Sequence, residues 1–377
     1  MKVIIIGASL SGLFTAYLLA KEGVEVEVYD KTDILGWPPR TLIVTRELEN
    51  VLDFFPEESI INEVWYIELF SRSKSARLEL SSPDLVIERE RLVKSLARLA
   101  EDAGTEVKLL HQFEGFAKFG KKVAVHFRNL ETNEEVQTST DVLVGADGGL
   151  SAVSGGDSRN GHRLTALLQA KVFLHEQRDS STCQVWFDSN HTKYFYWLIP
   201  ESEQTAIVGL IADDACQTGV CLTRFLQNRH LEPLEFQSAM VPMHRFGFAG
   251  EVLSNDRNIF VVGDAAAQVK VTTVGGVVTG LHGAKALAHA ILNGRNYTKA
   301  LWELKIELNL HLLIRQVLNR FSQVDYDELL GLIKGEFKDI LEKWNRDELT
   351  QSFLRLIWTE PRLIKLGAKA LLKSFLQ

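Results

Sequence analysis

The sequence predicts an α/β protein that combines a Rossmann-like domain, a mainly antiparallel β domain and a C-terminal helical segment. Three observations support this prediction. The first thirty residues follow the order strand, glycine turn, helix, strand and acid. Buried strands that end near an aspartate return later in the chain, and the residues between them have the two-residue period of half-buried strands. With 46% hydrophobic and 24% charged residues, the 377-residue chain has an ordinary globular composition.

The N-terminal pattern is that of a dinucleotide-binding βαβ unit. We expect strands at Lys2–Ile6 and Val24–Tyr29, with a helix at Leu13–Lys21 between them. Gly7 allows the chain to turn sharply off the first strand, and Gly12 allows the helix to pack close to the sheet. The unit therefore predicts a nucleotide cofactor.

The turn before this helix is expected to bind the cofactor's pyrophosphate, because N–H groups at a helix N-terminus and the helix dipole attract anions. The residues of the turn are Ser9, Leu10 and Ser11. Ser9 takes the place of the middle glycine in the usual G-x-G-x-x-G pattern. Asp30, followed by Lys31, is expected to accept hydrogen bonds from an adenosine ribose. NAD and FAD proteins share this unit, so these residues leave both cofactors open.

The net charge and the cysteine content narrow the class of protein. A formal net charge of −7 gives no electrostatic support to a nucleic-acid partner. The three cysteines, Cys183, Cys216 and Cys221, form no C-x-x-C pair and predict neither a disulfide framework nor a metal site. The sequence has no run of about 18 apolar residues, and it opens on a buried strand rather than a signal peptide. We therefore expect a cytoplasmic protein.

Between Asp30 and residue 150, apolar periodicity predicts a mixture of strands and helices. The expected elements are a short helix at Arg46–Leu52, strands at Val64–Leu69 and Ser75–Leu80, a helix at Glu88–Ala103, a strand at Thr105–Leu110, a β-hairpin made of Lys121–Arg128 and Glu135–Thr140, and a buried strand at Asp141–Gly145. A later strand at Asn258–Asp264 and a helix at Val278–Leu292 are expected to complete the parallel sheet.

Separated β-segments indicate a second domain. They are Leu164–Leu174, Thr182–Phe187, Tyr194–Ile199, Thr205–Ile211 and Phe236–Pro242, with one helix at Leu222–Arg229. We therefore predict a discontinuous nucleotide-binding domain made of residues 1–85, 86–150 and 250–295. Residues 36–85 are expected to contribute in part to the β-rich substrate domain at 151–249, and residues 296–377 form a helical region.

Two later strand ends complete the predicted cofactor site. Asp147 and Gly148 follow the strand at 141–145, and Gly263 and Asp264 precede the last helix of the sheet. A carboxylate at such a strand end lies near the ribityl chain and phosphate of a flavin, and the next helix N-terminus supports the negative charge of a reduced flavin ring. In this set of motifs the chain resembles the flavoprotein superfamily with the p-hydroxybenzoate hydroxylase fold.

The resemblance to this superfamily spans about residues 1 to 340 and implies bound FAD. Arg89, at the start of its helix, matches the superfamily's arginine that contacts the flavin side chain. The match implies that Asp30, Arg89, Asp264 and the two glycine turns bind most of the cofactor.

Within the superfamily, residues 263–276 are similar to geranylgeranyl reductases, whose pattern is close to G-D-A-A-G-x-x-K-P-T-T-G-G-G. Residues 195–200 are similar to that family's Y-x-W-x-F-P, which lines an isoprenoid pocket. The resemblance implies that Tyr196 and Trp197 form the substrate wall. It implies that Gly275 and Gly276 approach the flavin ring, with Val274 and Val277 beside them at the cofactor. The implied reaction is the reduction of isolated C=C bonds in an isoprenoid lipid by reduced FAD.

The chain also departs from the geranylgeranyl reductase pattern. Thr41 stands where the family often has a cysteine, so a catalytic cysteine is not available at this place. Val271 replaces the loop proline and Val274 a loop glycine. Ser154 stands where many hydroxylases of the fold carry an arginine, and no second glycine fingerprint marks an NADPH domain. The external electron donor stays open between NAD(P)H and ferredoxin.

Two other functions stay open. Residues 195–200 are also near the halogenase pattern W-x-W-x-I-P, without its first tryptophan. An oxygen-using monooxygenase or halogenase that acts on an aromatic substrate is therefore the first alternative. A flavin-binding protein without catalysis is the second.

The C-terminal tail bears on membrane contact. Its basic residues recur at spacings that place them on one face of a helix, and they are Arg362, Lys365, Lys369 and Lys373. Apolar residues, among them Leu366, Ala370 and Phe375, occupy the rest. Such a helix can lie peripherally on the inner face of a membrane, close to a lipid substrate, or dock on the protein core. The pattern leaves both alternatives open.

Overall fold

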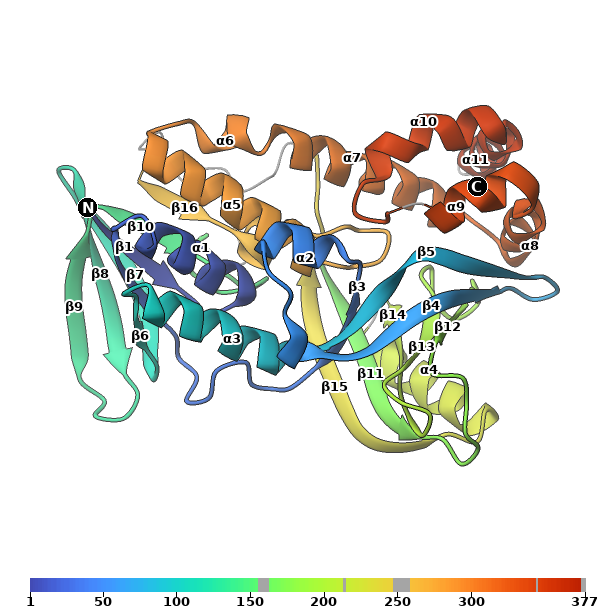
Figure 1. Ribbon diagram of the computed structural model, residues 1–377, viewed down its shortest axis with the longest axis horizontal. Helices are drawn as coiled ribbons and strands as arrows, with labels where there is room; N and C mark the ends of the chain where they lie inside the picture. The colour runs from blue at the N-terminus through green and yellow to red at the C-terminus, as the bar shows by residue number, and fades with distance from the viewer. Residues whose placement is uncertain (155–162, 213–214, 247–257, 344, 374–377) are drawn as a thin grey trace.

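A computed structural model describes residues 1–154, 163–212, 215–246, 258–343 and 345–373, and its strands form three sheets (Figure 1). One sheet has five strands, the second has eight, and the third has three. The α/β class predicted from the sequence is confirmed, with a parallel sheet, an antiparallel part and C-terminal helices. The domain boundaries stay a prediction, and the boundary at residues 249–250 lies outside the described residues.

The five-stranded sheet is parallel and has the order β16-β10-β1-β2-β6. Its strands are β1 (Lys2–Ile6), β2 (Glu25–Tyr29), β6 (Glu106–Lys108), β10 (Val142–Gly145) and β16 (Ile259–Val261). Alternate residues of β1 point to opposite faces of the sheet. Val3 and Ile5 pack with the helices on one face, and Ile4 and Ile6 pack with the three-stranded sheet on the other.

Three helices cover the first face of the parallel sheet, namely α1 (Leu10–Ala20), α3 (Arg89–Asp102) and α5 (Val277–Asn293) (Figure 1). The helix α1 begins three residues before the predicted Leu13, because Ser9 caps it. The Ser9 Oγ accepts a hydrogen bond from the Gly12 N–H at 3.2 Å. The turn between β1 and α1 is therefore shorter than predicted, and the N-terminus of α1 lies closer to the strand end.

The three-stranded sheet covers the second face and consists of β7 (His111–Phe119), β8 (Lys122–Asn129) and β9 (Glu135–Thr140). Tyr29 of the parallel sheet stacks on Phe127 of this sheet, with ring centroids 4.0 Å apart. The sequence predicted only the β8–β9 hairpin. It missed β7, because a bulge between Phe113 and Gly115 breaks the two-residue period.

The eight-stranded sheet has the order β15-β11-β14-β13-β12-β4-β5-β3. Its strands are β3 (Thr41–Val44), β4 (Ile60–Phe70), β5 (Ser75–Glu88), β11 (Leu164–Phe173), β12 (Thr182–Trp186), β13 (Tyr196–Pro200), β14 (Thr205–Ala212) and β15 (Glu232–Pro242). All pairs are antiparallel except β12 with β4. The helix α4 (Ala215–Asn228) packs on one face.

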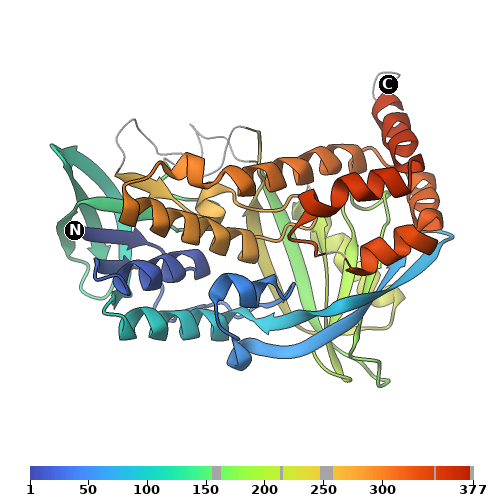
Figure 2. The same cartoon turned by 45° about the horizontal axis from the view of Figure 1, so that its top comes forward.

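The remaining elements are helical. They are α2 (Glu47–Leu52), 3₁₀ turns at Glu57–Ser59 and Gly263–Ala266, α6 (Tyr297–Ala300), α7 (Trp302–Leu318), α8 (Gln323–Leu332), α9 (Gly335–Lys343), α10 (Leu349–Thr359) and α11 (Arg362–Lys373). Figure 2 shows α7 extending over the eight-stranded sheet, where Arg315 of this helix donates to the Lys193 carbonyl at 2.6 Å. The C-terminal helices thus lie against the sheet face opposite α4.

The helix α11 is docked on the protein through its apolar face. Leu366 and Ala370 are buried in a cluster with Phe321 and Tyr326. Lys369 pairs with Asp325 at 3.1 Å and also with Glu328 at 3.0 Å, and Arg362 pairs with Glu360. Phe375 and the Lys373 side chain lie outside the described residues.

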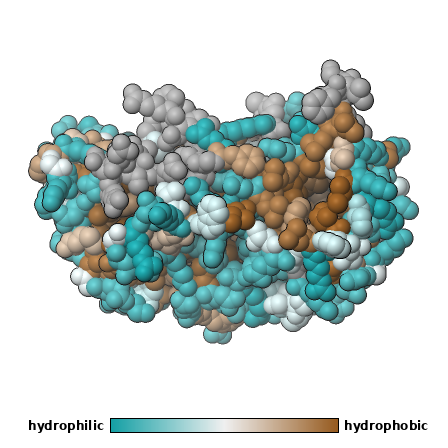
Figure 3. Space-filling model, turned by 90° about the horizontal axis from the view of Figure 1, so that it is seen from above, coloured by the Kyte–Doolittle hydropathy of each residue, from teal (hydrophilic) through white to brown (hydrophobic). Residues whose placement is uncertain are grey.

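The docked helices still present apolar side chains to solvent. The exposed residues are Leu354, Trp358, Ile364, Leu371 and Leu372. Figure 3 shows apolar side chains gathered on the half of the upper face that holds the C-terminal helices. In the part of the chain that the structure describes, no helix combines the length and the hydropathy needed to span a bilayer.

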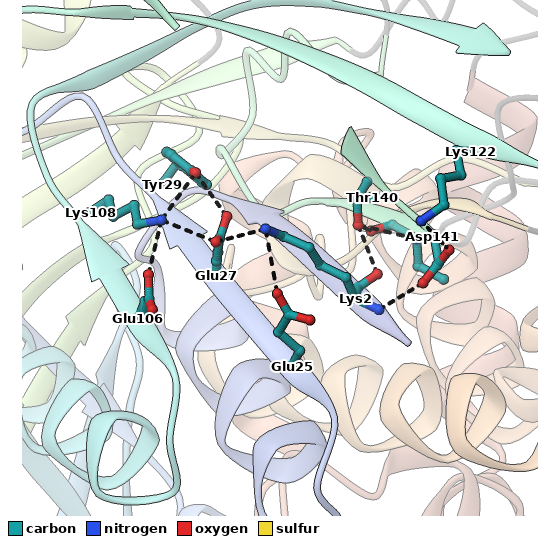
Figure 4. Close-up of polar contacts among 10 residues, drawn as sticks. Lys2, Glu25, Glu27, Tyr29, Glu106, Lys108, Lys122, Thr140 and Asp141 are labelled. Atoms are coloured by element: carbon teal, nitrogen blue, oxygen red, sulfur yellow. Dashed lines mark hydrogen bonds and ion pairs between the residues drawn. The ribbon is translucent and has the colours of Figure 1, made fainter. Parts of the chain in front are cut away.

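A network of charged side chains lies along the parallel sheet (Figure 4). Glu27 accepts hydrogen bonds from Lys2 Nζ and Tyr29 Oη, both at 2.8 Å, and lies 3.1 Å from Lys108 Nζ. Burial raises the pKa of Glu27, but these hydrogen bonds outweigh burial and hold the pKa below its ordinary value of 4.5. Burial and the Glu27 carboxylate raise the pKa of Tyr29 to about 12. Glu27 is therefore an anion that the fold stabilises.

Replacing Glu27 by Gln is expected to lower the free energy of unfolding at pH 7 by about 2 kcal/mol, because the lysines lose a charged acceptor. The folded-state pKa of Glu27 is depressed, so its stabilising contribution is complete above a pH of about 4.5 and is lost as the pH falls through the folded pKa. Urea unfolding should show that the difference between Glu27→Gln and wild type shrinks at lower pH.

Glu25→Gln is the matched control for this measurement. Its carboxylate is exposed and lies 3.6 Å from the same Lys2 Nζ, so its loss should cost less than about 0.5 kcal/mol. An equal loss of stability in both variants would contradict a specific role for Glu27.

Candidate functional site

The first glycine turn lies where β1, β10 and α1 meet. Gly7 has a φ of 104°, in the region that favours glycine, and its N–H donates to the Tyr29 carbonyl at 2.8 Å. A Cβ at Gly12 would lie 2.3 Å from the Gly7 carbonyl oxygen and 2.9 Å from the Ala146 Cβ. Both positions therefore require glycine for the sharp turn and the close helix packing that the sequence predicted.

Asp30 lies beside this turn at the end of β2. Its Oδ2 accepts a hydrogen bond from the Ala8 N–H at 2.7 Å, and its Oδ1 accepts from the N–H and the hydroxyl of Thr32, each at 2.9 Å. Leu10 and Ser11 at the start of α1 are buried, whereas Lys31 is exposed. The structure thus brings the acid to the turn between β1 and α1, as the βαβ pattern predicts.

The carboxyl ends of β10 and β16 lie at the same edge of the sheet as Gly7. Asp147 follows β10, and its Oδ2 accepts a hydrogen bond from the Ala152 N–H at 2.7 Å. Its buried Oδ1 has no hydrogen-bond partner among the described residues, and burial raises the pKa of this carboxyl. Gly148 has a φ of 85° and open space around it. Asp147 therefore retains one free acceptor at the site.

Two arginines face Asp264 near this edge. The backbone N–H of Arg89 donates to the Arg40 carbonyl at 3.0 Å, and Arg89 Nη1 donates to the Gly36 carbonyl at 2.9 Å. Burial raises the pKa of Asp264, and the charges of Arg40 and Arg89 oppose this rise. Burial, followed by the charge of Arg89, lowers the pKa of Arg40 to about 10. The Arg40 Nε is buried without a hydrogen-bond partner in the described part of the chain.

Arg40 belongs to the candidate site but was not predicted from the sequence. It follows an irregular segment with two prolines, Pro38 and Pro39, which gives no periodicity from which its direction could be read. Two arginine side chains, one of them with an unpaired Nε–H, can bind a phosphate or pyrophosphate group. The residues at this edge therefore fit the nucleotide cofactor that the sequence predicts.

The segment from residue 268 to residue 276, here named the 268–276 loop, connects the Gly263–Ala266 turn to α5. The Gln268 side chain accepts from the Gly263 N–H at 2.7 Å and donates to the Tyr297 hydroxyl at 3.0 Å. A Cβ at Gly276 would lie 2.8 Å from Asp264 Oδ1, so glycine is needed there for close approach. Val277 begins α5. The loop is thereby held next to the acidic strand end.

A strained valine closes the 268–276 loop. Val274 has a φ of 56°, in the left-handed region that β-branched residues avoid. Its N–H donates to the Lys270 carbonyl at 2.8 Å, and the Lys270 N–H donates to the Gly275 carbonyl at 3.0 Å. Because the related pattern has a glycine at position 274, this chain keeps the backbone shape of that pattern with an added apolar side chain.

The C-terminal helical region anchors the outer side of the 268–276 loop. Lys270 forms a buried ion pair with Asp347, which also accepts a hydrogen bond from Thr45 Oγ1 at 2.6 Å. Thr272 Oγ1 lies 2.6 Å from Nδ1 of His311 on α7. These contacts were missed because helical periodicity after residue 297 does not reveal which side chains meet a loop earlier in the chain.

The expected substrate wall is divided between two faces of the eight-stranded sheet. Trp197 packs in a buried apolar cluster with Val269 and Val274 of the 268–276 loop. Tyr196 lies on the opposite face and stacks on Phe225 of α4, with ring centroids 4.3 Å apart. The prediction that both residues line one wall is therefore corrected, because neighbouring residues of a strand point to opposite faces.

The face that carries Trp197 forms an apolar wall beside the loop. We use the name apolar wall for the side chains of Trp197, Ile199, Ile207, Ile211 and Val241, which cluster with Val269 and Val274. All seven are at most 8% exposed. The Trp197 Nε1 has no hydrogen-bond partner among the described residues. The wall is therefore a buried, mainly apolar surface that packs with the loop.

Thr41 continues this face into a polar patch. It is buried, and its hydroxyl donates to Glu201 Oε1 at 2.5 Å, while Glu201 Oε2 lies 2.9 Å from Lys171 Nζ. Gln169 Nε2 donates to the Thr41 carbonyl at 3.0 Å. These contacts fix the strand that follows Arg40 and hold the Thr41 side chain in one orientation.

The sequence matches a known protein family over most of its length. Residues 1–296 match the family described as FAD binding domain. The chain is also 26% identical to digeranylgeranylglycerophospholipid reductase 2 of Methanothermobacter thermautotrophicus, over 97% of this chain and 98% of that protein. It is 26% identical to digeranylgeranylglycerophospholipid reductase of Methanocaldococcus jannaschii, over 92% of this chain and 88% of that protein.

Solved structures share the fold of the chain. A geranylgeranyl bacteriochlorophyll reductase-like protein from Thermoplasma acidophilum superposes with a TM-score of 0.76 at 20% identity, covering 97% of this chain and 98% of that one. A halogenase in complex with FAD superposes with a TM-score of 0.65 at 12% identity, covering 98% and 85%. The family match and the glycines, carboxylates and arginines at the sheet edge are both consistent with bound FAD. The chain belongs to the FAD binding domain family and is an FAD-dependent oxidoreductase.

Proposed function

We propose that the chain reduces isolated C=C bonds of a geranylgeranyl lipid by hydride transfer from N5 of reduced FAD. The observation that carries this proposal is the apolar wall, because Trp197 of the wall belongs to the same buried cluster as Val269 and Val274 of the 268–276 loop. An isoprenoid chain is apolar and gains binding energy from such a surface. The names of the relatives in Methanothermobacter thermautotrophicus and Methanocaldococcus jannaschii support the same substrate class.

The proposed cofactor contacts follow from the geometry of the sheet edge. The first turn, from Gly7 to Gly12, and the N-terminus of α1 receive the pyrophosphate. Asp30 receives the ribose, and Arg40 with Arg89 neutralises the phosphate charge. The proposed set at the flavin end consists of Asp147, Gly148, Gly263, Asp264, Val274, Gly275, Gly276 and Val277. These residues orient the cofactor and exclude water, so that the reacting alkene is held close to the ring.

The reaction requires the protein to orient the alkene, to exclude water from the site and to supply a proton to the second carbon of the alkene. The apolar wall supplies the first two. Thr41 holds the place of the family's cysteine, and its hydroxyl donates to Glu201, so we assign it to the positioning of Arg40 rather than to catalysis.

Arg40→Gln is expected to raise the dissociation constant for FAD by about 10- to 100-fold, because a charge-assisted contact to phosphate is lost. The constant is measured by flavin fluorescence as the protein without FAD is titrated with the cofactor. Arg91→Gln is the control, since Arg91 is exposed on the same helix as Arg89. An unchanged dissociation constant in Arg40→Gln would remove this residue from the site.

The proposed reaction is tested with flavin that has been photoreduced without oxygen, so that no natural electron donor is needed. Adding a geranylgeranyl lipid is expected to restore the absorbance of the oxidised flavin, whereas the fully saturated lipid should not. Reduced flavin that persists with both lipids and reoxidises only when oxygen is admitted would contradict the proposal. That result would favour the monooxygenase or halogenase alternative.

Trp197→Phe is expected to lower kcat/KM for the lipid by about 10-fold, because a smaller ring leaves a gap in the apolar wall. Tyr196→Phe is the matched control from the same strand, and it should leave kcat/KM unchanged since Tyr196 packs on α4. The two constants are compared by anaerobic flavin reoxidation. Equal losses in both variants would show that the effect comes from the strand as a whole and not from the wall.

A further inference from the structure

Three polar side chains are aligned between the 268–276 loop and the C-terminal helices. The Thr272 hydroxyl lies 2.6 Å from His311 Nδ1, and His311 Nε2 lies 3.3 Å from Glu307 Oε1. Glu307 and His311 are one turn apart on α7, while Thr272 belongs to the loop. A hydroxyl, an imidazole and a carboxylate in this order are the parts of a proton relay.

The burial of the three side chains shows which end of the relay is closer to solvent. Glu307 and His311 are 7% and 4% exposed, whereas Thr272 is only half-buried. The Glu307 carboxylate also accepts the Leu349 N–H at 2.6 Å and the Thr350 N–H at 3.0 Å, and these bonds hold it in place. The hydroxyl of Thr272 therefore lies at the less buried end, in the loop that contacts the apolar wall. The carboxylate of Glu307 is fixed at the buried end, inside the protein.

We infer that Thr272, His311 and Glu307 deliver the proton that completes the reduction of the C=C bond. This inference rests on the proposed function. We assign Thr272 to the substrate end, because it is the least buried of the three residues and belongs to the loop whose Val269 and Val274 cluster with the apolar wall. His311 and Glu307 act through Thr272.

The proton transfers balance as follows. One alkene carbon receives the hydride, the π bond breaks, and the other carbon forms a C–H bond with the proton of the Thr272 hydroxyl. The Nδ1 proton of the His311 imidazolium moves to the Thr272 oxygen at the same time. His311 is left neutral with its remaining proton on Nε2, next to the Glu307 carboxylate. A proton from solvent restores the imidazolium before the next turnover.

The charges around His311 determine the pH dependence of the relay. Burial lowers the pKa of His311 below its ordinary value of 6.5, and the Glu307 carboxylate, 3.3 Å from Nε2, opposes this. The charge of Lys270 lowers the pKa further, that of Asp347 raises it, and His244 also lies close enough to interact. The relay needs the imidazolium, so the reaction should become faster as the pH falls through the pKa of His311.

The first test measures anaerobic flavin reoxidation by a geranylgeranyl lipid as a function of pH in FAD-loaded protein. Wild type should show a rate constant that falls as the pH rises through the pKa of His311. His311→Asn keeps a polar partner for Thr272 but does not titrate. We expect its rate constant to be about 100-fold lower and independent of pH in this range.

Two further variants separate the relay from a role in folding the loop. Thr272→Val should lose about as much rate as His311→Asn, and Thr272→Ser should recover it to within a few-fold, because the hydroxyl returns. His289→Asn, which removes an exposed histidine of α5, should behave like wild type. The FAD dissociation constants of all four variants should match wild type, since none of these residues is proposed to bind the cofactor.

A second readout does not depend on turnover. Nitrogen-15 NMR of the imidazole groups in the oxidised, FAD-loaded protein should show histidines with a pKa below 6.5, and the signals of one of them should be missing in His311→Asn while those of His244 stay. The Nδ1 resonance of His311 should shift in Thr272→Val.

The relay is overturned if His311→Asn keeps the rate and the pH profile of wild type, or if Thr272→Ser is as slow as Thr272→Val. Wild-type protein whose reduced flavin is not reoxidised by the lipid at any pH would instead overturn the proposed function, and the relay with it. The two failures are therefore distinguishable in one set of measurements.

Discussion

The site depends on how the 268–276 loop is held from two sides. On the inner side, Gln268 ties the loop to the Gly263 N–H and to Tyr297. On the outer side, Lys270 pairs with the buried Asp347. Together with the buried Val269 and Val274, these polar contacts fix the backbone of the loop where the strand end, the apolar wall and α7 meet. They also hold Val274 at its strained φ of 56°.

The fixed 268–276 loop connects the parallel sheet with the eight-stranded sheet, and the two sheets are suited to different ligands. The parallel sheet gathers glycines, an acid and two arginines at one edge, where a charged cofactor can be bound. The eight-stranded sheet presents buried aliphatic and aromatic side chains, where an uncharged chain can be bound. The loop follows a strand of the parallel sheet and packs against the eight-stranded sheet through Val269 and Val274. The C-terminal helices complete the arrangement from outside, through His311 and Asp347.

Local patterns in the sequence predicted the parts of the site that are set by local geometry. Gly7, Gly12 and Asp30 lie where a βαβ unit requires them, because turn and strand fix their positions. Residues whose place depends on distant packing were not predicted. Tyr196 and Trp197 are adjacent in sequence, yet the pleat sends them to opposite faces, and only the packing of α4 shows which face is which. Arg40 and His311 reach the site from an irregular segment and a distant helix, where periodicity carries no information on contacts.

The composition of the product tests most directly whether the apolar wall, the loop and the flavin together reduce an isoprenoid chain. Photoreduced protein is incubated with a geranylgeranyl lipid without oxygen, and the lipid is then analysed by mass spectrometry. We expect a product that has gained two hydrogen atoms for each double bond reduced. A lipid that returns unchanged without oxygen, and gains an oxygen or a halogen atom only after oxygen is admitted, would contradict this expectation.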